Sequence, residues 1–217
     1  MHCVLEGVTK QLLELWLTPS ERDCFIGTPS NLSVLDERLK CIKPPQWFTR
    51  LPRRLSERMH WKASEWIWWL LHYSVPCLHG MLPQPYLDHL CLLVECIFLL
   101  LKDAVTPDDI TRACDLATEF VVKMQTLYGQ RAMTFNIHQM LHLPKSVQML
   151  GPLWTHSSFV FEGGNGTLVK LVSDGNGVPL QILERYVMCL NAKLLRSTID
   201  ISEATVSLQS VQSQKIL

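Results

Sequence analysis

The chain has 217 residues, enough for one substantial hydrophobic core or for one domain with a fragment of another. Hydrophobic residues make up 47% of the sequence and charged residues 18%, which excludes an intrinsically disordered chain. Twenty basic side chains balance twenty acidic ones, so any binding to nucleic acid must depend on a local cluster rather than on net charge.

The cysteine pattern and the hydrophobic segments bear on location. The eight cysteines form no Cys-x-x-Cys pair, and several lie in apolar stretches, as in proteins of a reducing compartment. The N-terminus shows no signal-peptide pattern. Residues 90–101 are the most membrane-like stretch, but Glu95 interrupts them, and they are shorter than the ~20 residues that cross a bilayer. The sequence therefore predicts an intracellular protein with no membrane partner.

Helical spacing of apolar residues begins at the N-terminus. It predicts a first helix over 4–17 and a second, shorter one over 33–42 with Ser33 as its N-cap. A tryptophan-rich helix should cover 62–73. Pro76 is expected to end it, because proline removes a backbone donor from a helix.

Two helices in the middle of the chain are predicted to be its longest, over 85–104 and 107–127. Thr106 is an expected N-cap, because a proline and two acids follow it, and Gly129 is an expected C-terminal stop. The core is expected to gather around three aromatic side chains, Trp66, Trp69 and Phe98.

The last third of the chain also has helical patterns. Helices are predicted over 135–143, ended by Pro144, and then over 158–172 and 179–195. Because no credible set of strands occurs, the sequence predicts an all-α fold. Its expected parts are a helical domain, a pair of C-terminal helices and a loosely ordered tail, at 1–157, 158–196 and 197–217.

A local basic stretch lies between residues 43 and 62. Trp47, Phe48 and Trp61 are interleaved with its cations, a mixture suited to a phosphate backbone with exposed bases. The alternative is a solvated loop that its aromatic residues anchor to the core. The candidate nucleic-acid-binding residues are Lys43, Arg50, Arg53, Arg54, Arg58 and Lys62.

Two histidines and one glutamate form the second candidate site. His138 and His142 are four residues apart, so both imidazoles fall on one face of a helix and can converge on a zinc ion. The alternative is a pair of core or surface histidines bonded to neighbours. Glu162 is a carboxylate in an apolar, glycine-rich setting, where packing alone does not explain it.

Several stretches together resemble the C-terminal part of a DDE-type cut-and-paste transposase of the CACTA (En/Spm) group. The similarity covers roughly residues 1–190 and keeps the family's order of blocks. The blocks are MHCVLEGVTKQLLELWL, WKASEWIWWLLHYSVPCLHG, LYGQRAMTFNIHQMLHL, GPLWTHSSFVFEGGNG and the stretch 181–186.

This resemblance implies a fold and a set of roles. Residues 1–157 would be a helical insertion domain, and 158–196 the terminal helices of an RNase H-like core whose strands are missing. His2 would join His138 and His142 as a zinc ligand, and Glu162 would be the catalytic glutamate. The full enzyme would use Mg²⁺ or Mn²⁺ in two-metal phosphoryl transfer. The resemblance also implies a nuclear location, with transposon-end DNA and a second copy of the chain as partners.

The family's two other catalytic acids are strand-borne aspartates upstream of the block that begins at Met1. We therefore expect a transposase fragment that does not cleave DNA by itself. The alternatives are an incomplete gene model and a domesticated or decayed non-catalytic helical module that binds DNA or a transposase subunit.

Overall fold

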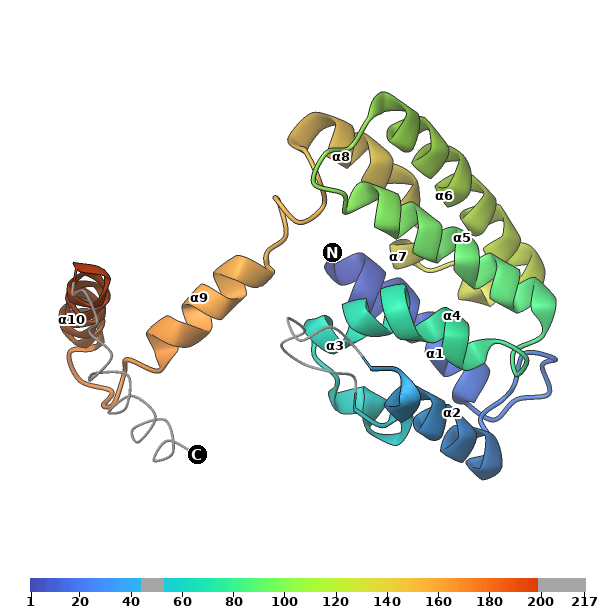
Figure 1. The fold of residues 1–217 in the computed structure, drawn as a ribbon, viewed down its shortest axis with the longest axis horizontal. Helices are drawn as coiled ribbons and strands as arrows, with labels where there is room; N and C mark the ends of the chain where they lie inside the picture. The colour runs from blue at the N-terminus through green and yellow to red at the C-terminus, as the bar shows by residue number, and fades with distance from the viewer. Residues whose placement is uncertain (44–52, 199–217) are drawn as a thin grey trace. The chain divides into compact units, whose positions relative to one another are not determined.

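The computed structural model describes residues 1–43 and 53–198, and all regular structure in these ranges is helical (Figure 1). The all-α class predicted from the sequence is therefore confirmed. The chain divides into two compact units, Met1–Ser157 and Ser158–Leu217, and each is described by itself. Within the described ranges, no helix has both the length and the apolar character needed to cross a membrane.

The first unit is a bundle of helices connected by short loops. Its elements in chain order are η1 (Cys3–Thr9), α1 (Lys10–Leu17), α2 (Pro29–Cys41), η2 (Leu55–His60), α3 (Ala63–Trp68), η3 (Trp69–Tyr73), α4 (Ser74–Leu78), α5 (Gln84–Leu100), α6 (Pro107–Tyr128), η4 (Gln130–Ala132), α7 (Phe135–Gln139), η5 (Met140–His142) and α8 (Leu143–Leu150). The second unit contains α9 (Phe159–Val169) and α10 (Val178–Thr198).

The N-terminal helix is central to the core of the first unit. The π-helical η1 runs directly into α1, and the apolar residues that predicted this helix, Val8 and Leu12 among them, are buried. At its far end the Trp16 indole N–H donates to the Tyr128 hydroxyl over 3.0 Å, so the polar atom of a buried tryptophan has a partner.

Gly7 allows η1 to lie directly against α7. A Cβ atom at Gly7 would stand only 2.6 Å from Asn136 Nδ2, so the absence of a side chain permits this close approach. The approach brings the start of the chain next to the helix that carries the two histidines. The glycine in the N-terminal sequence block thus has a packing role.

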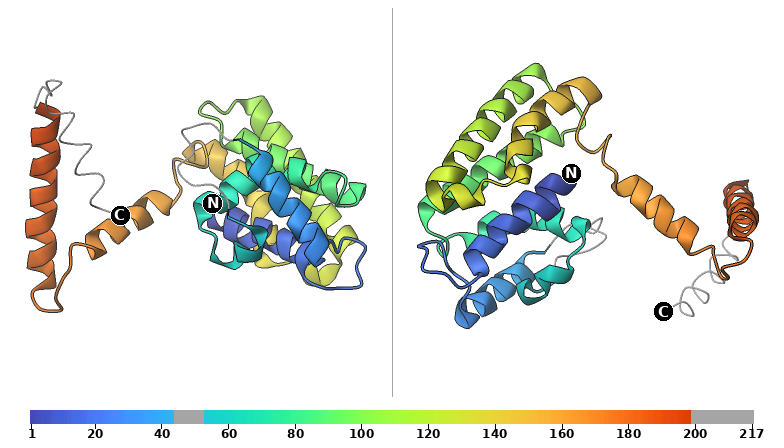
Figure 2. Two further views of the ribbon diagram at one scale, coloured as in Figure 1. Left: turned by 60° about the horizontal axis from the view of Figure 1, so that its bottom comes forward. Right: turned by 180° about the vertical axis from the view of Figure 1, so that it is seen from behind.

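Helices α5 and α6 form a long antiparallel pair at one side of the unit, as the views in Figures 1 and 2 agree. The Thr106 hydroxyl accepts a hydrogen bond from the Asp109 backbone N–H, which confirms the predicted N-cap of α6. The Lys102 ammonium bonded to Asp109 lowers the pKa of that carboxyl to about 2. At the other end, α6 stops before Gly129, whose φ of 82° favours glycine.

Two predictions about the core are wrong in detail. Trp66 and Trp69 are buried as expected, but the Phe98 side chain is 58% exposed on the outer face of α5. Because α5 is apolar on nearly every side, its sequence pattern does not reveal which face turns inward. In addition, α10 has 21 residues against 17 in α5, so α5 is not one of the two longest helices.

Three predicted helix boundaries are also wrong. Helix α2 begins at Pro29 with Thr28 as its N-cap, rather than at Ser33. Pro76 and Pro144 do not end helices, because each lies in the first turn of a following helical segment, α4 and α8. A proline in a first turn removes an N–H that has no intrahelical partner, so these positions tolerate it.

Candidate functional site

The two histidines of the central sequence block form a close pair on the surface. His138 lies in α7 and His142 ends η5, and their Nε2 atoms are 3.1 Å apart. The rings meet edge to face, with centroids 4.9 Å apart. Ile137 and Met140 are fully buried between them in the sequence, so packing of these side chains turns both imidazoles outward.

The spacing of the pair suits a metal ion. Two nitrogens bound to zinc at 2.0–2.1 Å with a tetrahedral angle lie about 3.3 Å apart. The observed Nε2–Nε2 distance of 3.1 Å is close to that value, so little rearrangement would let both nitrogens bind one ion. The pair is therefore a preformed half-site for a divalent metal.

In the described ranges, no group of three or more His, Cys, Asp or Glu side chains is arranged to hold a metal ion. His2 is the residue before η1, and η1 lies beside α7, the helix of His138. Zinc binding by His2, His138 and His142 together stays a prediction. The geometry supplies two of the four ligands that a closed zinc site needs.

Glu162 belongs to the second unit. It lies in the first turn of α9 with an exposed side chain, and the same helix contains Gly163, Gly164 and Gly166. The three glycines lower helix propensity by up to ~1 kcal/mol each, yet α9 forms through them. Its role as a catalytic acid stays a prediction.

A polar clasp ties the loop after α9 to α10. The Gln181 Oε1 atom accepts hydrogen bonds from the backbone N–H groups of Ser173 and Asp174, at 3.0 and 3.4 Å. Its Nε2 donates to the carbonyls of Asp174 and Asn176 at 3.1 and 2.6 Å. One side chain thus satisfies several backbone groups of the turn, which accounts for a glutamine at this position in the last sequence block.

The basic stretch divides into two kinds of residue, and Arg53 represents the first kind. Its Nε and Nη2 atoms donate to the two carboxylate oxygens of Glu65 at 2.8 and 3.1 Å, and the Glu65 side chain is fully buried. Burial alone would raise the pKa of Glu65. Hydrogen bonds from Arg53 and from the Lys62 backbone N–H outweigh burial and hold this pKa below its ordinary value.

Arg58 has a similar internal partner. It donates from Nε and Nη2 to the Glu14 carboxylate at 2.7 and 3.1 Å, and from Nη1 to the Leu55 carbonyl. This pair joins η2 to α1, two segments that are distant in the sequence. Arg53 and Arg58 therefore stabilise the fold, and contact of either residue with nucleic acid stays a prediction.

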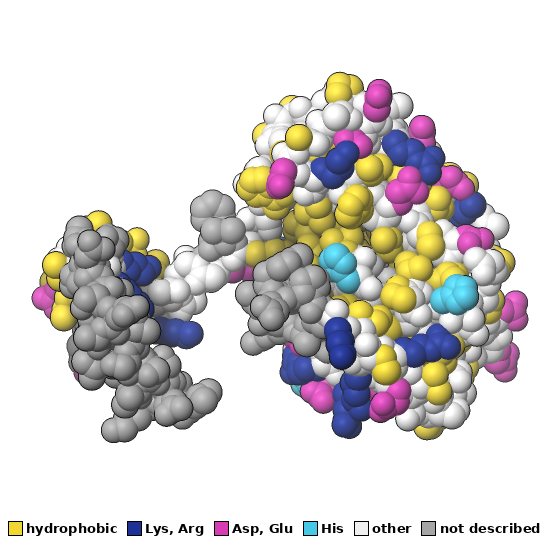
Figure 3. All heavy atoms as spheres, in the orientation of Figure 1, with side chains coloured by type: hydrophobic (Ala, Val, Ile, Leu, Met, Phe, Trp, Pro, Cys, Tyr) yellow, Lys and Arg dark blue, Asp and Glu magenta, His cyan; other side chains and the backbone are white. Residues whose placement is uncertain are grey.

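Lys43, Arg54 and Lys62 represent the second kind. All three are exposed, and no ion pair links them to another residue in the described ranges. Figure 3 shows Lys and Arg side chains gathered over the α2–α3 region of the first unit, with acidic side chains among them. Arg50, Trp47 and Phe48 lie outside the described residues.

Trp61 follows the anchoring alternative. It is 5% exposed and packs against Trp66 and Trp69, with ring centroids 4.9 and 5.8 Å apart. It therefore fastens the end of the basic stretch to the core instead of presenting a ring to a base.

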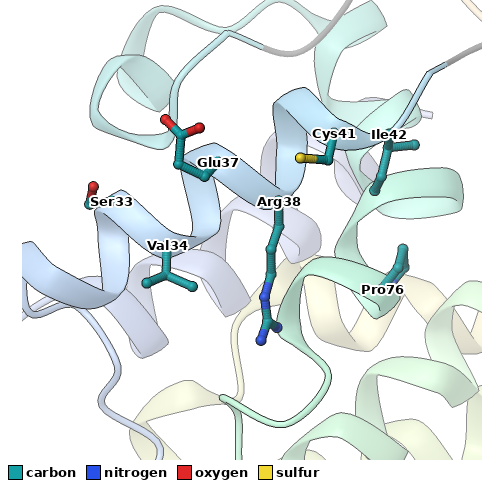
Figure 4. A pocket seen from close by; sticks show the side chains of 7 residues that line it. All are labelled: Ser33, Val34, Glu37, Arg38, Cys41, Ile42 and Pro76. Carbon is teal, nitrogen blue, oxygen red and sulfur yellow. The ribbon is translucent and has the colours of Figure 1, made fainter.

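A shallow groove of about 510 Å³ lies between α2 and α4, near the basic surface (Figure 4). Its lining residues are Ser33, Val34, Glu37, Arg38, Cys41, Ile42 and Pro76. Arg38 reaches from α2 to the end of α4, where its Nη1 atom donates to the carbonyls of Cys77 and His79. These bonds satisfy carbonyls at a helix C-terminus, so the guanidinium already has a structural function.

Two of these features have a local signal in the sequence that the predictions did not use. Glu65 stands three residues after Lys62 and directly before an apolar run, the position of a capping-box acid. Gln181 follows a loop rich in glycine, aspartate and asparagine, whose backbone groups need partners. The link from Glu65 to Arg53 has no local signal, because the residues are twelve positions apart.

Comparison of the chain with protein-family models, with curated proteins and with solved structures gives no match.

Proposed function

We propose that this chain is the C-terminal part of a CACTA-type DDE transposase and that its first unit is a helical module that holds DNA. The ordered set of sequence blocks supports this origin. The chain carries one family-position carboxylate, Glu162, so phosphoryl transfer with Mg²⁺ or Mn²⁺ would belong to the full enzyme.

The observation that carries DNA binding is the division of the basic stretch. Arg53 and Arg58 are bonded to Glu65 and Glu14, and this accounts for them without any ligand. The exposed cations Lys43, Arg54 and Lys62 lack such an account and can each neutralise a phosphate. A phosphate backbone is the polyanion that a local basic surface on a neutral chain would attract.

The test is the salt dependence of DNA binding by the double variant Arg54→Ala/Lys62→Ala. We expect weaker binding and a log–log salt slope that is shallower by about 1 for each phosphate that the variant no longer neutralises. The matched control is Arg112→Ala/Lys123→Ala on α6, which removes two cations on the opposite side of the first unit from α3 in Figure 1.

Fluorescence anisotropy with a labelled duplex at several salt concentrations measures both quantities. Equal slopes for the double variant and its control would place the DNA elsewhere. No salt-sensitive binding by the unaltered chain would remove the proposed DNA-holding role altogether.

A non-catalytic helical module is the second candidate, and one observation favours it. Around Glu162, as elsewhere in the described residues, no cluster of carboxylates is arranged to bind two metal ions. We expect the purified chain to show no Mg²⁺- or Mn²⁺-dependent cleavage of a transposon-end duplex. Nicking that is present in the unaltered chain and absent in Glu162→Gln would show instead that the chain is itself catalytic.

A further inference from the structure

We propose that the His138–His142 pair binds one zinc-like divalent ion between two copies of this chain, with each copy supplying two imidazole nitrogens. The inference rests on the proposed metal binding by this pair and adds the source of the remaining ligands. The bound ion would join two chains, so the metal would control self-association.

The first step of the argument is the geometry of the pair. The Nε2 atoms are 3.1 Å apart on a helical segment whose intervening residues are buried. Side chains four residues apart on a firmly packed helix keep their spacing, so the two nitrogens are held ready for one ion. Zn²⁺ is a suitable occupant, since it binds imidazole nitrogen and takes four ligands.

The second step is the ligand count. Where side chains are described, no three His, Cys, Asp or Glu residues form a group able to hold a metal ion. One chain therefore presents a half-site of two nitrogens. A two-fold axis through the ion would bring the same half-site from a second copy and complete a tetrahedral four-histidine site.

The third step is the surface next to the pair. Phe135 and Leu141, each three residues from His138, are 75% and 38% exposed. Two exposed apolar side chains beside a metal half-site are unfavourable in water, and a partner that covers the ion would cover them as well. A second copy brings the same apolar side chains together with the two missing ligands.

The experiment is a zinc titration of the full chain, with molar mass followed by sedimentation velocity and bound zinc by metal analysis. We expect a zinc-dependent dimer that contains one ion for two chains. His142→Ala should abolish both the dimer and the bound ion. His156→Ala is the control, because it removes an exposed histidine outside the pair.

Both variants remove exposed side chains, so unaltered thermal unfolding without zinc should verify that each one folds. One zinc bound per chain at monomer mass would overturn the bridging inference while keeping a metal site on the chain. A dimer that forms without zinc and survives His142→Ala would also overturn it. No zinc binding at all would remove both the bridge and the metal site.

Discussion

Arg53→Ala should destabilise the first unit by about 2–3 kcal/mol, because it leaves the buried Glu65 carboxylate without its main partner. Glu65 is fully buried, and Arg53 contacts both of its oxygens. The Lys62 backbone N–H would remain as a donor to Glu65 Oε2, at 2.8 Å. Arg53 is 42% exposed, so water can partly replace it, and this places the effect below that of a fully buried pair. Urea denaturation measures the change.

The matched control is the neighbouring Arg54→Ala, which removes an exposed cation and should change stability by no more than about 0.5 kcal/mol. The double variant Arg53→Ala/Glu65→Gln should regain part of the loss, because a neutral amide costs less to bury than a carboxylate. Equal stabilities for Arg53→Ala and Arg54→Ala would contradict this account of the Arg53–Glu65 pair.

These two arginines also show where sequence reasoning stops. They are adjacent and identical in type, so the sequence assigns both to one nucleic-acid-binding stretch. The fold separates them, because Arg53 reaches a carboxylate that α3 buries and Arg54 stays at the surface. Only a contact between elements reveals that difference, and no local pattern in the basic stretch contains it.

Features fixed by local chemistry could be predicted. Thr106 and Gly129 mark the ends of α6 because capping depends on the few residues around each terminus. The closeness of His138 and His142 follows from helical spacing alone. A third metal ligand would have to come from a distant segment or from another chain, and spacing within one helix says nothing about it.

Features fixed by packing could not be predicted. Phe98 and Leu93 both lie in the apolar α5, yet Leu93 is fully buried and Phe98 is mostly exposed. The choice depends on where α6 lies, which the composition of α5 does not contain. Likewise Pro144 begins α8 instead of ending the preceding helix, because α8 packs against α6 and continues the helical path.

Acid should weaken the first unit through His89, which is fully buried between α5 and α6. Its Nε2–H donates to the Phe120 carbonyl over 2.9 Å, and its ring stacks on the Phe120 ring with centroids 4.3 Å apart. The Nδ1 atom is buried with no hydrogen-bond partner among the described residues. A proton added there would create a charge without an acceptor, and burial lowers the pKa of His89 to about 4.

The sign of the effect follows from proton binding. The unfolded chain takes up this proton near the ordinary histidine pKa of 6.5, and the folded chain only near 4. Stability from neutral His89 is therefore complete above about pH 6.5 and falls as the pH drops, by about 2 kcal/mol from pH 7 to pH 5 and about 3 kcal/mol by pH 4. Glu65, whose pKa is lowered from 4.5, adds its own loss only as the pH falls below that value.

His89→Gln isolates this contribution. A glutamine amide can still donate to the Phe120 carbonyl but does not titrate, so the variant should lose most of the slope of unfolding free energy between pH 7 and pH 5. Partial burial lowers the pKa of His72 as well, so a small slope in the same direction should persist. Urea denaturation at several pH values gives both slopes. If the variant and the unaltered chain weaken equally between pH 7 and pH 5, the acid sensitivity does not come from His89.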